Sequence, residues 1–187
     1  MSTDISWPCK NLKSDDYGKV YWITGLAGAG KTTLAKYLYD HWKKKKANLV
    51  FLDGDILREV LGDSASHTFE ERFKLAMKYS KLCSLLSSQG LDVICATISM
   101  FDKCREWNRS NLVNYFEIYI KVPLEVLKQR DQKKLYSRFA IGEIRNVMGL
   151  DLSFEEPKYS DLIIENDGSQ TPQELCKKLL NFLSKKE

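Results

Sequence analysis

The chain has 187 residues, of which 43% are apolar and 29% are charged. This composition is that of an ordinary globular domain and excludes a disordered or fibrous protein, and the length suits one domain with a substantial core. The net charge of +4 is too small to indicate nucleic-acid binding, whereas a small anionic ligand suits it equally well. The basic run at residues 43–46 lies at a predicted helix end without interleaved aromatic residues, which is typical of a solvated helix terminus. We therefore expect no nucleic-acid partner.

Cysteine usage and apolar runs indicate the compartment. The cysteines are odd in number and form no C-x-x-C pair, which argues against a disulfide or zinc framework: Cys9, Cys83, Cys95, Cys104 and Cys176. The first 18 residues are polar and lack the apolar stretch of a signal peptide. No apolar run approaches the roughly 20 residues that span a bilayer. We expect a cytoplasmic protein without a membrane partner.

The pattern along the chain predicts an N-terminal arm followed by one domain. In residues 1–18, Pro8, Asn11 and Gly18 interrupt any periodicity, and residues 19–187 then alternate strands with helices. The alternation predicts an α/β fold with a mostly parallel five-stranded sheet covered by helices on both faces. The strands are expected at residues 20–24, 48–52, 92–99, 116–122 and 162–164, and the helices at 33–42, at 69–89, from Pro123 and from Thr171.

A phosphate-binding loop follows the first predicted strand. Its residues fit G-x-x-x-x-G-K-[ST] without a gap: Gly25, Leu26, Ala27, Gly28, Ala29, Gly30, Lys31 and Thr32. The glycines let backbone N–H groups surround a polyphosphate, and the helix that continues through Thr33 directs the positive end of its dipole at the same place. Lys31 would act on the β- and γ-phosphates of ATP, and the Thr32 hydroxyl would bind Mg²⁺. A glycine-rich turn that matches by chance is disfavoured, because the motif joins a strand to a helix.

The segments after this loop resemble those of one kinase family. Leu52-Asp53-Gly54-Asp55 followed by Arg58 resembles the L-D-G-D-x-x-R segment of adenylyl-sulfate kinases. The resemblance covers about residues 20–168 and continues through Ile98-Ser99, residues 122–126, Gln129-Arg130-Asp131, Leu135-Tyr136, residues 142–146, Gly149-Leu150-Asp151 and Glu156-Pro157. It implies a three-layer P-loop NTPase sandwich with a lid. It also implies transfer of the ATP γ-phosphoryl, with Mg²⁺, to a ribose 3′-hydroxyl.

The resemblance assigns roles to three charged residues after the second strand. Asp55 would accept or orient the proton of the acceptor hydroxyl and is, with Lys31, a predicted catalytic residue. Arg58 and Arg72 would bind the anionic groups of the acceptor, since a guanidinium group binds oxygens in bidentate fashion. The alternatives stay open at this stage: Asp53 and Asp55 also fit a turn pair around a glycine, and both arginines fit exposed helix positions.

Further positions take their roles from the same resemblance. Residues 133–146 match the family's mobile lid, whose cations would close over the transferring phosphoryl group and exclude water, although a basic loop is often merely solvated. Arg130 matches a residue near the adenine of ATP. The lid cations are Lys133, Arg138 and Arg145, and the acceptor site would further include Leu75, Ile98, Ser99 and Val147.

The departures from the family pattern fall together on the residues that resemble an adenine-reading set. Leu75 stands where the family has an asparagine, and Val147 stands where it has the phenylalanine that stacks on the acceptor's adenine. The other stacking phenylalanine falls near His67, with Phe69 two residues on. Loss of a stacking ring removes roughly 1–3 kcal/mol per base, if nucleic-acid magnitudes transfer. Two further replacements, of a common asparagine and proline, are Ile56 and Met100.

The sequence therefore predicts an ATP-dependent nucleotide 3′-kinase with a small nucleotide as acceptor. Cytidine diphosphoramidate, the acceptor of similar enzymes in capsule modification, is favoured by the changed positions. Adenylyl sulfate, the acceptor in sulfate assimilation, fits if those changes are neutral drift. A non-catalytic nucleotide-binding domain is a third alternative, against which the retention of Asp55 together with Lys31 argues. Members of the family are commonly dimers, so a homodimer is compatible with the sequence.

Overall fold

Five parallel strands form one sheet at the centre of the protein. The computed structural model describes residues 13–61 and 68–186. The strand order is β2-β3-β1-β4-β5, and every neighbouring pair is parallel. The predicted fold class, an α/β fold with a five-stranded parallel sheet, is confirmed. The strands are β1 (Lys19–Thr24), β2 (Leu49–Asp53), β3 (Asp92–Thr97), β4 (Asn114–Lys121) and β5 (Leu162–Glu165).

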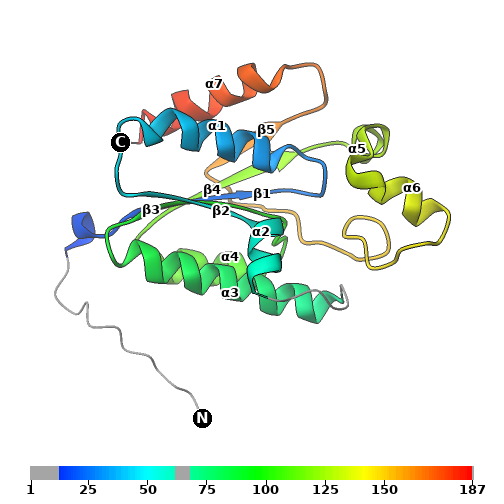
Figure 1. The fold of residues 1–187 in the computed structure, drawn as a ribbon, viewed down its shortest axis with the longest axis horizontal. Coiled ribbons are helices and arrows are strands. Elements are labelled where there is room, and N and C mark those ends of the chain that lie inside the picture. The colour runs from blue at the N-terminus through cyan, green and yellow to red at the C-terminus, as the bar shows by residue number, and fades with distance from the viewer. Residues whose placement is uncertain (1–12, 62–67, 187) are drawn as a thin grey trace, which may run out of the picture.

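Helices cover both faces of this sheet and one of its ends. In Figure 1, α1 and α7 lie on one face, α2, α3 and α4 lie on the other, and α5 and α6 lie beyond one end of the strands. This makes three layers, as a parallel sheet requires. The helices are α1 (Lys31–Lys43), α2 (Gly54–Val60), α3 (Phe69–Ser87), α4 (Asp102–Asn111), α5 (Leu124–Arg130), α6 (Leu135–Ala140) and α7 (Pro172–Leu183), and short 3₁₀ turns are η1 (Ser14–Asp16) and η2 (Gln132–Lys134).

The central strand, β1, is almost completely buried. Residues 20–23 of β1 are at most 1% exposed, because β3 and β4 flank the strand and helices cover it above and below. The covering helices begin at sequence signals. Thr68 caps α3, and a capping box of Thr171 and Glu174 opens α7 with Pro172 in its first turn.

Several element boundaries differ from the sequence-based expectation. Helix α1 begins at Lys31, two residues earlier than predicted. Strand β3 ends at Thr97 and not at residue 99, because Ser99 has a φ of 22° and cannot continue the strand. Helix α3 ends at Ser87, and Gly90 follows with a φ of 77°, close to the predicted stop. The predicted strands otherwise agree within about two residues, which is the normal scatter of boundary assignment.

The last part of the predicted N-terminal arm contacts the body of the domain. The side-chain amide of Asn114, at the start of β4, donates to the carbonyls of Ser14 (3.1 Å) and Tyr17 (3.0 Å). The amide of Gly18 donates to the Ser87 carbonyl at 2.8 Å. Residues 1–12 of the arm lie outside the described residues.

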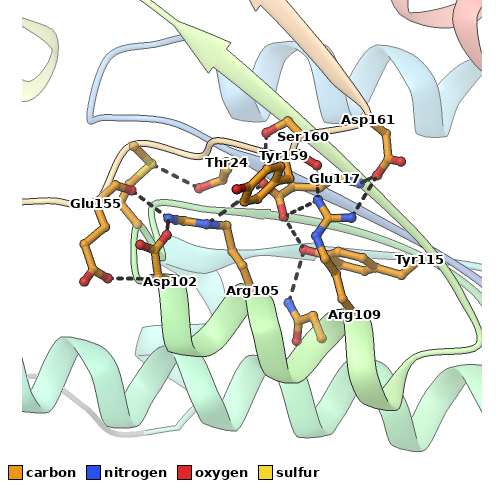
Figure 2. A network of polar contacts seen from close by, with 12 residues as sticks. Thr24, Asp102, Arg105, Arg109, Tyr115, Glu117, Glu155, Tyr159, Ser160 and Asp161 are labelled. Carbon is orange, nitrogen blue, oxygen red and sulfur yellow. Dashed lines mark hydrogen bonds and ion pairs between the residues drawn. The ribbon is translucent and has the colours of Figure 1, made fainter.

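A buried ionic network joins α4 to β4 and to the segment that leads into β5. Glu117 is 1% exposed and faces the guanidinium groups of Arg105 and Arg109, with nearest contacts of 4.0 Å and 3.1 Å (Figure 2). Its other hydrogen bonds come from the hydroxyls of Tyr115 (3.2 Å) and Ser160 (2.9 Å). The network therefore supplies the buried Glu117 carboxylate with the hydrogen bonds and charge partners that solvent would otherwise give it.

The same network holds the segment at residues 155–161. Arg105 donates to the Glu155 carbonyl at 2.8 Å and pairs with Asp102. Arg109 donates to the Tyr159 carbonyl and lies 3.7 Å from Asp161 (Figure 2). The segment contains no helix or strand, so these contacts replace the backbone ladder that would otherwise fix it.

Removal of the Glu117 carboxylate tests whether this network carries stability. Glu117→Ala should lower the free energy of unfolding by roughly 3–5 kcal/mol, because it leaves two guanidinium groups without their shared buried partner. Asp40→Ala, which breaks the exposed Lys36–Asp40 pair (3.1 Å), is the matched control and should change stability little. Chemical denaturation of both variants measures the difference, and equal losses would show that the buried network carries no special stability.

Candidate active site

One cavity opens at the carboxyl ends of the strands, where the connection from β3 crosses over β1 to β4. This change of direction is where open α/β sheets bind ligands. The cavity has a volume of about 980 Å³. It brings together most of the predicted site residues: Ala27, Gly28, Gly30, Lys31, Thr32, Thr33, Asp55, Arg58, Arg72, Leu75, Ile98, Ser99, Lys133, Arg138, Arg145 and Val147.

Four predicted residues do not line this cavity. Three of them belong to the phosphate-binding loop but are buried in the protein interior: Gly25, Leu26 and Ala29. At Gly25 a Cβ atom would lie 2.6 Å from the Ile120 carbonyl oxygen, so only glycine allows the loop to leave β1 at this point. Arg130 is half-buried beside Asn166, to which it donates at 2.9 Å.

The phosphate-binding loop has the conformation that its sequence predicts. Gly28 and Gly30 have φ values of 81° and 96°, which glycine adopts without strain. The loop ends directly at the first turn of α1. The N–H groups of that turn have no partner inside the helix, and they point out of its N-terminus toward the cavity. This arrangement is a ready site for a polyphosphate.

The Lys31 ammonium group lies against the loop. It donates to the Leu26 carbonyl at 2.8 Å. Burial lowers the pKa of Lys31 to about 8, although the charges of Asp55 and Asp53 oppose this shift, and Lys133 lowers it further. An added phosphate charge would favour the protonated form, so this group is poised to become fully charged when an anion binds.

Asp53 joins the phosphate-binding loop to the start of α2. Its carboxylate accepts from the Thr32 hydroxyl at 2.7 Å and, with its other oxygen, from the Asp55 amide at 2.9 Å as the N-cap of α2. The sequence left open whether Asp53 is only a turn residue. It caps helix α2, and it also accepts from the hydroxyl that is predicted to bind Mg²⁺.

Asp55 is an exposed carboxylate that lines the cavity. It accepts from the Lys133 ammonium at 2.7 Å and lies 3.8 Å from Arg58. Burial acts to raise the pKa of Asp55, but the hydrogen bond and charge of Lys133, with smaller effects from Arg58 and Lys31, lower it below its usual value. The group is therefore ionised at neutral pH and is held by a lid cation.

The far wall of the cavity combines one arginine with apolar side chains. Arg72 donates to the Asn146 carbonyl at 2.9 Å, and burial and the neighbouring Arg58 charge lower its pKa, with Asp151 opposing. Leu75 and Val147 are buried residues that line the same wall. This wall is apolar where the family resemblance expects an amide and an aromatic ring.

The backbone of this wall is fixed by one carboxylate. Asp151 accepts from the amides of Asn146 (2.7 Å) and Val147 (2.6 Å). Of the second predicted stacking region, His67 lies outside the described residues. Phe69 packs edge-on against Phe101, with ring centroids 5.0 Å apart.

The segment predicted to be a lid contacts the phosphate-binding loop through α6. Tyr136, on α6, donates its hydroxyl to the Ala27 carbonyl at 3.0 Å, and burial raises the pKa of Tyr136 to about 12. Arg138 pairs within the lid with Glu143 at 2.8 Å, whereas Lys133 reaches across to the acceptor side. In the sequence, Tyr136 belongs to a segment that resembles the family, but no role is predicted for it. No local sequence pattern indicates its contact with the phosphate-binding loop.

Comparison with known proteins shows the family. The family model for adenylylsulphate kinase matches residues 17–165. The chain belongs to the adenylylsulphate kinase family. It is an enzyme, a nucleotide kinase that transfers a phosphoryl group to a hydroxyl group.

Two relatives with different acceptors are similar over nearly the whole chain. Identity is 42% over 173 residues with the cytidine diphosphoramidate kinase of Campylobacter jejuni subsp. jejuni serotype O:2, covering 92% of this chain and 99% of that protein. It is 35% over 169 residues with the adenylyl-sulfate kinase of Halothermothrix orenii, covering 90% and 91%.

A solved structure shows the same fold. The Mycobacterium tuberculosis APS kinase CysC, in complex with AMPPNP and APS, superposes with a TM-score of 0.82 at 28% identity, covering 90% of this chain and 98% of that one. In the described part of the chain, no helix combines the length and the apolar character that crossing a bilayer requires.

The pKa of Lys31 predicts how triphosphate binding depends on pH. Below about pH 8 the ammonium group is already charged and binding should be insensitive to it. Above that pH, binding must take up a proton, and affinity should fall by up to about tenfold per pH unit. Calorimetric titration with ATP across this range measures the slope, and Lys31→Met should abolish it. A wild-type affinity that stays constant well above pH 8 would contradict the assignment.

Proposed function

We propose that this kinase uses MgATP to phosphorylate the ribose 3′-hydroxyl of cytidine diphosphoramidate. The observation that carries the proposal is the division of the cavity wall. The charged groups suited to phosphate chemistry are present, while Leu75 and Val147 make an apolar surface at the positions matched to an adenine-reading set. The higher identity to the cytidine diphosphoramidate kinase than to the adenylyl-sulfate kinase supports the same acceptor.

The donor side would hold ATP through the loop amides and Lys31. Mg²⁺ fits the neighbouring donor set, because the Thr32 hydroxyl and the carboxylates of Asp53 and Asp55 all line one end of the cavity. Among the described residues there is no cluster of three or more His, Cys, Asp and Glu side chains that would form a closed metal site. This suits an ion that takes its remaining ligands from phosphates and water. When bound, the ion would neutralise charge on the β- and γ-phosphates.

Asp55 is the group that would receive the acceptor hydroxyl. Its carboxylate is ionised, and it stands at the start of α2 beside the phosphate loop. Lys133 donates to one of the two oxygens of this carboxylate at 2.7 Å. When a triphosphate binds, its charge competes for the Lys133 ammonium, and transfer of that cation to the phosphates would free Asp55 for the hydroxyl.

Arg58 and Arg72 would bind the anionic tail of the acceptor. Both line the cavity, and Arg58 lies on the helix that carries Asp55. Because these two groups would recognise the tail and not the base, they serve either acceptor equally. The choice between acceptors then depends on the apolar wall.

Asp55→Asn tests the catalytic assignment. It keeps the shape of the side chain but removes the charge, so ATP should bind with little change while kcat falls by about 10²–10⁴-fold, the usual effect of losing a positioned acid or base. Rapid-quench turnover and ATP titration separate the two effects. Turnover above about a tenth of the wild-type rate would show that Asp55 is not the base.

The acceptor assignment is tested by comparing kcat/KM for cytidine diphosphoramidate and adenylyl sulfate. The wild-type enzyme should prefer the cytidine nucleotide, and the KM for ATP should not depend on the acceptor. Val147→Phe combined with Leu75→Asn should shift the preference toward adenine by about 1–3 kcal/mol, the value of one stacking ring. Val113→Phe is the matched control, because it makes the same exchange of side chains at an exposed position that does not line the cavity, and it should not change the preference.

A preference of the wild-type enzyme for adenylyl sulfate would support the alternative acceptor. A wild-type enzyme that phosphorylates adenylyl sulfate efficiently and leaves cytidine diphosphoramidate unchanged would contradict the proposal. The apolar wall would then be a drifted form of an adenine pocket. Asp55, Lys31 and both arginines would keep their roles in that case.

A further inference from the structure

The side-chain amide of Asn166, next to the phosphate-binding loop, both donates and accepts a hydrogen bond. Asn166 follows β5, is 8% exposed, and its own amide donates to the Lys121 carbonyl at 2.8 Å, which extends the pairing with β4. Its Nδ2 donates to the Ala29 carbonyl at 3.0 Å, and its Oδ1 accepts from Arg130 at 2.9 Å. Because a carbonyl only accepts and a guanidinium only donates, the partners leave one orientation of the amide.

The contact with Ala29 has a consequence on the other side of the loop. In a planar trans peptide the C=O bond points opposite to the N–H bond of the next residue. Asn166 holds the Ala29 carbonyl away from the cavity, so the Gly30 N–H is turned toward the place where the loop binds phosphate. Two other loop carbonyls also accept hydrogen bonds from side chains, that of Leu26 from Lys31 and that of Ala27 from Tyr136.

The second partner of Asn166 is Arg130, the residue that the family resemblance places near the adenine of ATP. Arg130 closes α5 and also approaches the Asn166 carbonyl at 3.5 Å, so its guanidinium group is held at two points. Gly168 lies beside it, and a Cβ atom there would be 3.8 Å from the guanidinium nitrogen. These contacts hold a side chain with a long flexible stem in one position.

We propose that Asn166 is a positioning residue for the phosphoryl donor, joining the phosphate loop and the Arg130 guanidinium through one amide. It contacts no reacting atom in this role. It orients the Gly30 amide for the triphosphate and Arg130 for the base, so both ends of the nucleotide depend on it. Only a side chain that donates at one end and accepts at the other makes both contacts at once.

Binding of ATP and of inorganic tripolyphosphate, which has no base, separates the two contacts. Asn166→Ala and the larger Asn166→Leu, which fills the space without an amide, should each weaken both ligands by about tenfold, the usual cost of an unpaired buried polar group. Arg130→Ala should weaken ATP to a similar degree and leave tripolyphosphate unchanged. Asn114→Ala, which removes an amide bonded to two carbonyls near the opposite ends of the strands, should change neither.

The outcomes separate this role from a structural one. Thermal unfolding checks that each variant is folded, and equal binding losses in the Asn166 and Asn114 variants would overturn the proposal. Loss of ATP binding without loss of tripolyphosphate binding would also overturn it, because Asn166 would then act only on Arg130. The proposal rests on ATP as the donor. Wild-type protein that binds neither ligand would overturn the donor site itself and the role of Asn166 with it.

Discussion

The carboxylate of Asp53 makes two hydrogen bonds, and each of them fixes one side of the cavity. One bond, to the Thr32 hydroxyl, sets the first turn of α1 and with it the phosphate loop. The other, to the Asp55 amide, starts α2 and sets the carboxylate proposed as the base. Strand β3 lies between β1 and β2, so the two sides have no direct ladder between them at this edge. The distance between donor and acceptor chemistry therefore depends on one residue at the end of β2.

This arrangement explains how the acceptor can change while the chemistry stays the same. The phosphate side is built mainly from backbone groups, whose positions depend on glycine conformations and on side chains that hold loop carbonyls. The acceptor base would meet side chains of α3 and of the segment after the lid, such as Leu75 and Val147. Such side chains can be exchanged without moving the phosphate-binding loop. The backbone beside Val147 keeps its position, because the Asp151 carboxylate accepts from the amides of Asn146 and Val147. Binding energy toward the base is thus separable from catalysis.

The sequence predicted those features that local patterns encode. The glycine spacing located the loop, and apolar runs located all five strands. Helix α4 was missed because its buried residues are Cys104, Arg105 and Asn108, which give no apolar stripe, and Arg105 is instead satisfied by ionic partners. The contacts that organise the site join residues far apart in the chain. Lys133 and Asp55 are 78 positions apart and Asn166 and Ala29 are 137 apart, so no spacing rule indicates them.

We infer that a nucleotide triphosphate and a 3′-hydroxyl meet at Asp55, at the carboxyl ends of β1 and β2. A crystal structure of the enzyme with a non-hydrolysable ATP analogue, Mg²⁺ and cytidine diphosphoramidate tests it most directly. In that structure the acceptor 3′-oxygen should lie within hydrogen-bond distance of the Asp55 carboxylate and in line with the γ-phosphate, and Lys133 should have moved from Asp55 to the phosphates. An acceptor hydroxyl bound away from Asp55, or Lys133 still paired with that carboxylate beside a bound triphosphate, would contradict it.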